Sequence, residues 1–162
     1  MNRVFAFRGH AWIALVARLY LGGVFLAACA HKILRPGMFA IDVATYQFLP
    51  LYLVNLFALV LPWVEAFTGV MLILGIRVRA ASLLIIGMMI SFMIALTWAL
   101  YLGLDMSCGC FASQAAAQDD PISWRTLLRD AFWLVLSIYV FALDRDAIGV
   151  ERLLNKWRQR HG

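Results

Sequence analysis

The chain has 162 residues, of which 64% are hydrophobic and only 14% charged, whereas soluble domains are about 45–50% apolar and about 25% charged. This composition excludes a soluble globular domain. The length leaves room for one domain and, at roughly 20 apolar residues for each membrane-spanning helix, for a handful of spans. The formal net charge of +5 could indicate nucleic-acid binding, but basic residues that orient a membrane protein explain it more simply.

Apolar segments, taken in chain order, predict an all-α integral membrane protein built as a four-transmembrane-helix bundle. The first segment is broken only by Arg18 and the second only by Glu65, while the third contains no charged residue. The fourth opens at Asp120 and Pro121, an acidic N-cap followed by proline at the first helical position. We find no strand alternation that would indicate a barrel. The predicted spans cover residues 11–31, 43–76, 80–104 and 120–143.

The distribution of basic residues predicts the orientation of these spans. With both termini and the 77–79 turn on one side, that side holds ten basic residues against four, so the positive-inside rule places both termini in the cytoplasm of a bacterial cell. Loops 32–50 and 105–122 would then face the periplasm. We expect a transmembrane domain over residues 1–146 and a basic tail over 147–162 that forms an interfacial helix. The ten residues are Arg3, Arg8, Arg18, Arg77, Arg79, Arg145, Arg152, Lys156, Arg158 and Arg160, and the four are Lys32, Arg35, Arg125 and Arg129.

Cys108 and Cys110 fall in the second periplasmic loop, in an oxidising compartment where thiols form disulfides, act in redox chemistry or bind metals. Gly109 between them permits the sharp bend that a disulfide across one residue requires. Such a ring is strained, and strained, exposed disulfides are the labile and catalytic ones. A redox pair, a soft-metal site for Cu(I), Zn or Hg and two inert loop cysteines all remain open.

Cys29 lies at the outer end of the first span and is ambiguous. It sits in the small-residue stretch 27–30, which suits close helix packing, so it can be a core residue. It can also be a resolving thiol or a third ligand for the loop pair, since Lys32 is close enough to favour a thiolate. Residues 26–29 also look like a lipoprotein cleavage box, but Arg18 would interrupt the apolar part of that signal peptide.

Charged residues within the spans each require a partner or a function, because an ionisable group near the bilayer centre costs about 2.5–3.5 kcal/mol. We predict a structural pair between Arg18 and Glu65, with a proton or substrate relay as the alternative. Arg125 and Arg129 lie one helical turn apart on the fourth span, close to Trp124. Arg129 and Trp124 could hold a quinone, or the arginines could extend to lipid headgroups.

The sequence resembles the MauE branch of the DoxX-like membrane proteins over about residues 14–143. The most specific element is Cys108-Gly109-Cys110-Phe111 followed by Ile122-Ser123-Trp124 and Leu127-Leu128-Arg129-Asp130. Ala112 departs from the family pattern, which usually continues with glycine. The earlier matches are Arg18, Gly22 to Leu26, Lys32-Ile33, Phe39, Tyr46, Leu49-Pro50, Leu61 to Glu65 and Gly69.

The resemblance implies a four-helix membrane protein of extracytoplasmic thiol redox chemistry, paired with a thioredoxin-like protein that matures disulfide-containing proteins. We therefore expect Cys108 and Cys110 to exchange disulfides with that partner, with Cys29 as a resolving thiol. We expect electrons to pass to or from membrane quinone, because the sequence has no second cysteine pair near the cytoplasmic side to relay them. In this hypothesis Trp124, Arg129 and Lys32 belong to the cofactor site. A soft-metal binding or transport subunit and a non-enzymatic scaffold for an oxidoreductase complex are the alternatives.

Overall fold

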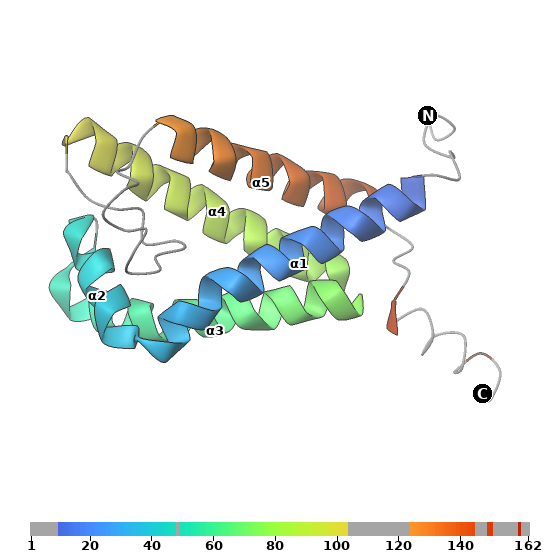
Figure 1. The fold of residues 1–162 in the computed structure, drawn as a ribbon, viewed down its shortest axis with the longest axis horizontal. Helices are drawn as coiled ribbons and strands as arrows, with labels where there is room; N and C mark the ends of the chain where they lie inside the picture. The colour runs from blue at the N-terminus through green and yellow to red at the C-terminus, as the bar shows by residue number, and fades with distance from the viewer. Residues whose placement is uncertain (1–9, 48, 104–123, 145–148, 151–158, 160–162) are drawn as a thin grey trace.

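The structure is a computed structural model that describes residues 10–47, 49–103, 124–144, 149–150 and 159. These residues form helices and contain no strand. Four of the helices are long and apolar enough to cross a membrane, which confirms the predicted all-α integral membrane fold. The helices are α1 (His10–Leu34), α2 (Pro36–Thr45), α3 (Leu51–Leu74), α4 (Val78–Tyr101) and α5 (Trp124–Leu143) (Figure 1).

The four long helices pack as two pairs, α1 with α3 and α4 with α5. The pairs lie close together at one end of the bundle, which we call the terminal end. Helix α1 begins there, α5 ends there, and a short turn there connects α3 to α4. The pairs spread apart toward the other end, where α2 lies, and we call this the α2 end (Figure 1). Since α1 begins and α5 ends at the terminal end, the described chain enters and leaves the bundle on the same side.

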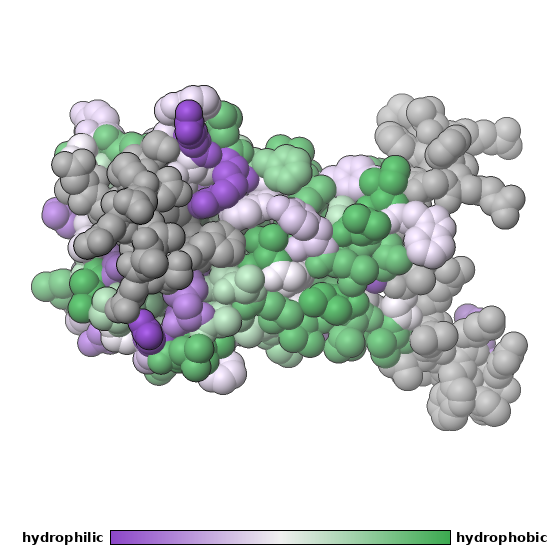
Figure 2. All heavy atoms as spheres, in the orientation of Figure 1, coloured by the Kyte–Doolittle hydropathy of each residue, from purple (hydrophilic) through white to green (hydrophobic). Residues whose placement is uncertain are grey.

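Large apolar side chains cover the outside of the bundle. Trp12, Leu51 and Val135 are 65%, 79% and 65% exposed, and Figure 2 shows apolar side chains over the middle of this face, with hydrophilic ones gathered toward the α2 end. Soluble monomers rarely expose apolar patches larger than a few hundred Å². The apolar outer surface is therefore the part of the protein that lipid tails would cover.

Glycine sets the contact between α1 and α3. A Cβ atom on Gly22 would lie 2.9 Å from the Gly69 carbonyl oxygen and 2.7 Å from Ile73 Cγ1. The backbones of the two helices can approach this closely only because both positions lack a side chain. At the end of α3, Gly75 takes a left-handed conformation with φ of 70° and terminates the helix.

Helix α2 is the main difference from the sequence prediction, which treated residues 32–50 as a loop and 43–76 as one apolar segment. Pro36 stands at the start of α2, where a missing N–H is harmless, and Pro50 lies directly before α3. Phe39 and Val43 of α2 are buried in one cluster with residues of α3. The long apolar segment therefore holds the end of α2 and the whole of α3, which are two separate helices.

Several predictions concern residues outside the described part of the chain. These are the Cys108–Cys110 loop, the start of the fourth span at Asp120 and Pro121, the domain boundary after residue 146 and the interfacial helix of the tail.

Candidate functional site

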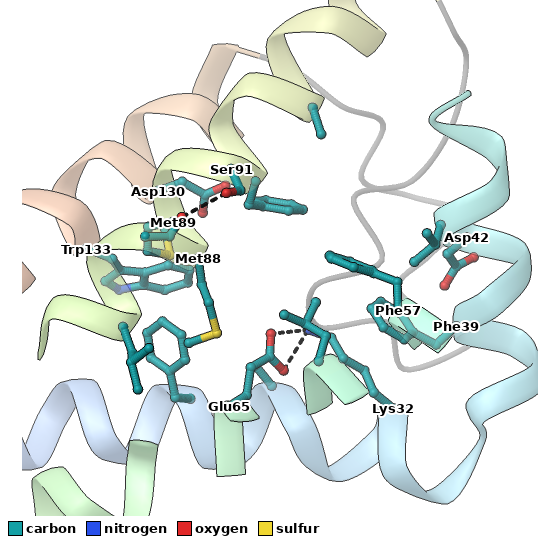
Figure 3. A pocket seen from close by; sticks show the side chains of 18 of the residues that line it. Lys32, Phe39, Asp42, Phe57, Glu65, Met88, Met89, Ser91, Asp130 and Trp133 are labelled. Carbon is teal, nitrogen blue, oxygen red and sulfur yellow. Dashed lines mark hydrogen bonds and ion pairs between the residues drawn. The ribbon is translucent and has the colours of Figure 1, made fainter. Parts of the chain in front are cut away.

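A pocket of about 520 Å³ lies among all five helices, where the two helix pairs spread apart (Figure 3). Apolar side chains form most of its walls. Three of them, Phe57, Leu83 and Leu84, are also 40%, 57% and 49% exposed on the apolar outer surface. The pocket therefore reaches the surface that faces lipid. Its polar and ionisable lining residues are Lys32, Asp42, Tyr46, Glu65, Ser91, Asp130 and Trp133.

A buried ion pair forms one wall of the pocket. Lys32 Nζ donates to Glu65 Oε1 at 2.8 Å and to Oε2 at 3.0 Å, and both residues are buried. The ammonium group also lies 5.0 Å from the centre of the Phe39 ring, a cation–π contact. Because helical side chains lean toward the helix N-terminus, Lys32 of α1 and Glu65 of the antiparallel α3 lean toward each other.

The predicted Arg18–Glu65 pair is wrong. Arg18 Nη1 instead donates to Asp144 Oδ2 at 3.3 Å, directly after α5. Arg18 also lies beside Gly75, whose Cβ would be 3.1 Å from Arg18 Nη1, and Gly75 is about 15 Å of helix rise from Glu65. The sequence places Arg18 within reach of Glu65 only if its side chain leans toward the membrane centre, whereas on α1 it leans toward the terminal end.

Asp130 forms another wall of the pocket and is 1% exposed. Arg129 Nε donates to Asp130 Oδ1 at 3.1 Å, and the Arg129 guanidinium lies 4.9 Å from the centre of the Trp133 ring. The other carboxylate oxygen, Oδ2, is buried and accepts no hydrogen bond within the described part of the chain. Asp130 thus brings one bound and one unbound oxygen to the pocket.

Helix α2 contributes two titratable groups, Asp42 and Tyr46. Burial raises the pKa of Tyr46 above its ordinary value, and the negative charges of Asp42 and Asp130 add to this effect while Arg129 opposes it. The Tyr46 hydroxyl therefore stays protonated at neutral pH. Burial also raises the pKa of the Asp42 carboxyl, against the opposing charge of His31.

The predicted cofactor residues have different places in the structure. Lys32 lines the pocket, paired with Glu65. Arg129 does not line the pocket itself, but its Nε donates a hydrogen bond to Asp130, which does. Trp124 is 66% exposed at the start of α5 and does not line the pocket either.

Cys29 is buried on α1, and its thiol donates to the Leu26 carbonyl oxygen at 3.2 Å. It is not a lining residue of the pocket. The other two predicted catalytic residues, Cys108 and Cys110, lie outside the described residues. Among those that are described, no three histidine, cysteine or acidic side chains are grouped as they would be to hold a metal ion.

Sequence reasoning assigned no site role to Phe39, Tyr46 or Asp130, although all three are among the residues that carry the family resemblance. The structure brings them together with Lys32 and Glu65 around one pocket, from segments as far apart as residues 32 and 130. The match of these residues to the family pattern could have indicated a shared site, but hydropathy alone does not show that they lie together.

A bundle of four membrane-crossing helices around a pocket with buried charges defines the class as a multi-pass integral membrane protein. The family model described as "Methylamine utilisation protein MauE" matches residues 10–143. The chain belongs to this family, as its sequence motifs predict. No curated protein and no solved structure gives a significant match to the chain.

Proposed function

We propose that the protein is a thiol/disulfide oxidoreductase of the bacterial inner membrane, with both termini in the cytoplasm. In this proposal Cys108 and Cys110 exchange disulfides with a periplasmic thioredoxin-like protein, and the pocket binds membrane quinone. Oxidation of the two thiols to a disulfide releases two electrons and two protons, and one quinone accepts both to become the hydroquinone. A thiolate attacks the partner disulfide, or is released from it, through a mixed disulfide.

The observation that carries the proposal is the pocket and its position. Its volume of about 520 Å³ lies within the roughly 300–1,000 Å³ of small-molecule sites. Its walls are apolar, and it reaches the lipid-facing surface at Phe57, Leu83 and Leu84, from which a lipid-soluble molecule could enter. The described helices that flank the cysteine segment, α4 and α5, end and begin at the α2 end, where the pocket lies.

The residues of the pocket fit a quinone. Aromatic walls are supplied by Phe25, Phe39 and Trp133, and polar groups stand on separate walls, with Lys32 and Glu65 on one and Asp130 on another (Figure 3). An apolar site with a few fixed polar groups is the usual form of a cofactor pocket. In the proposal these residues orient the ring and exclude water, while the loop cysteines perform the thiol chemistry.

The thiol step is tested by trapping. Removing one cysteine of the pair should stall the exchange at the mixed disulfide, so either Cys108→Ser or Cys110→Ser should accumulate a reducible covalent adduct while the other forms none. Cys29→Ser tests whether Cys29 resolves the adduct. If neither loop variant traps a partner and both lose stoichiometric copper or zinc, the protein is a metal-binding protein and the proposal fails.

The orientation and the quinone step need separate measurements. A membrane-impermeant thiol reagent, applied to intact cells after mild reduction, should label Cys108 or Cys110; labelling only after the inner membrane is opened would overturn the topology. Reduced protein in lipid nanodiscs should convert a soluble ubiquinone or menaquinone analogue to its hydroquinone, followed by absorbance. The Cys108→Ser variant should not, and an equal rate in that variant would refute the electron transfer.

A further inference from the structure

The carboxylate of Asp130 is held in one orientation. Arg129 Nε binds Oδ1 at 3.1 Å, and the Arg129 guanidinium is itself fixed over the Trp133 ring at 4.9 Å. Arg129 forms an ion pair with the Asp130 carboxylate, and both oxygens of a carboxylate are hydrogen-bond acceptors. With Oδ1 bound to Arg129, the remaining acceptor at this wall of the pocket is Oδ2.

Oδ2 is buried and accepts no hydrogen bond in the described part of the chain. Buried polar groups in proteins are nearly always hydrogen-bonded, and leaving one unsatisfied is costly, more so for a charged group. Asp130 is 1% exposed and lines the pocket, so a ligand in the pocket is a source from which Oδ2 can gain its donor.

Three other polar side chains of the pocket, Lys32, Glu65 and Ser91, are already bound. Lys32 donates to both oxygens of Glu65 and lies over Phe39. Ser91 donates to the Gly87 carbonyl oxygen at 3.0 Å. Asp130 therefore differs from these groups in having an oxygen left for a ligand.

We propose that Asp130 Oδ2 accepts a hydrogen bond from the ring hydroxyl of a lipid-soluble aromatic ligand, so that the pocket binds the hydroxyl form in preference to the ether or carbonyl form. An aromatic ring matches the walls at Phe25, Phe39 and Trp133, and lipid solubility matches the opening on the apolar surface. The hydroxyl is the donor that Oδ2 lacks. In this assignment Arg129 is a positioning residue that acts through Asp130.

If the ligand is a quinone, a step that rests on the proposed function, the preference selects the hydroquinone. Tighter binding of the reduced form favours reduction of the bound quinone by two thiols, which gives a disulfide and a hydroquinone. Asp130 would then favour electron flow from the thiols to the quinone.

The test compares two probes that differ only in the donor, a 4-alkylphenol and its methyl ether, titrated against the full-length protein in lipid nanodiscs by calorimetry. A hydrogen bond to a charged acceptor contributes about 1.5–3 kcal/mol, so the phenol should bind at least about tenfold more tightly than the ether. Asp130→Asn keeps an oxygen for Arg129 and places an amide donor where Oδ2 was, so the preference should fall below about threefold.

Asp144→Asn is the matched control, because it removes another buried carboxylate close to α5 but outside the pocket; it should keep the phenol preference. Equal binding of the two probes to the unmodified protein, or tighter binding of the ether, overturns the proposal even if Asp130→Asn does not fold. The probes need no cysteine chemistry. A phenol preference without quinone reduction would refute the proposed function alone, and quinone reduction without a phenol preference would refute this inference alone.

Discussion

Glu65→Gln should destabilise the protein strongly, because it leaves the Lys32 ammonium without a counter-charge inside the bundle. Lys32 and Glu65 are 5% and 7% exposed, and neither has another opposite charge within ion-pair distance among the described residues. The remaining contact of the ammonium is the Phe39 ring at 5.0 Å. A cation–π contact contributes about 2 kcal/mol when desolvated, which does not replace a carboxylate.

The magnitude follows from the geometry. Two unit charges at the observed separations of 2.8 and 3.0 Å attract by about 5.5–6 kcal/mol at an effective dielectric constant of about 20. Desolvation of both groups offsets much of this attraction when the pair is intact, but not when one partner is removed. Losing one member of a buried pair typically costs about 3–5 kcal/mol, and we expect that range for Glu65→Gln.

A double-mutant cycle measures the pair directly. Glu65→Gln, Lys32→Met and the double variant are compared by reversible unfolding in mixed micelles, and the double variant should recover at least about 2 kcal/mol of the summed losses. The control cycle combines Glu65→Gln with Arg18→Met, which should be additive within about 0.5 kcal/mol because the two sites do not touch. Additivity of Lys32 with Glu65, or coupling of Arg18 with Glu65, would refute the pairing.

Three further predictions concern the stability of the bundle. Gly22→Ala should lower the free energy of unfolding by about 1–3 kcal/mol, because its Cβ would lie 2.9 Å from the Gly69 carbonyl oxygen; Gly23→Ala, which meets nothing within 4 Å, should be neutral or stabilising in the same unfolding assay. Asp144→Asn should lower the melting temperature in detergent, because Arg18 loses its bound carboxylate; an unchanged melting temperature would contradict a structural role. Because folding raises the Asp42 pKa, stability should fall as pH rises from the unfolded value of about 3.9 through the raised value, and Asp42→Asn should abolish that part of the pH dependence.

Hydropathy predicts the four spans because a membrane helix is long, apolar and continuous, and these properties can be read along one chain. The same method missed α2. Its ten residues are as apolar as those of a span, with Phe39 and Val43 buried against α3. The breaks between α2 and α3 include Gln47, which has a left-handed φ of 50°, and Pro50 directly before Leu51. Hydropathy alone does not distinguish a short helix packed on the bundle from the first turns of a spanning helix.

Charge pairing was predicted less well because it depends on which way side chains lean. Depth along the helix alone brings Arg18 near Glu65, but Arg18 on α1 leans toward the terminal end, where Asp144 follows α5. Lys32, assigned to the outer loop from the sequence, belongs to the last turn of α1 and leans back into the bundle. Pairing in a bundle is therefore decided by helix direction as well as by depth.

The buried carboxylates are of two kinds: two of them link segments of the fold, and the third does not. Those of Glu65 and Asp144 accept hydrogen bonds from a lysine and an arginine on α1, so each ties two segments of the fold together. The carboxylate of Asp130 is bound by its neighbour in sequence, Arg129, and joins no two elements, while its second oxygen stays unsatisfied in the described structure. An unsatisfied buried oxygen costs the fold stability, and native proteins break such rules mainly at functional or strained sites. Asp130 is therefore the carboxylate whose position is explained by the pocket rather than by the packing of the bundle.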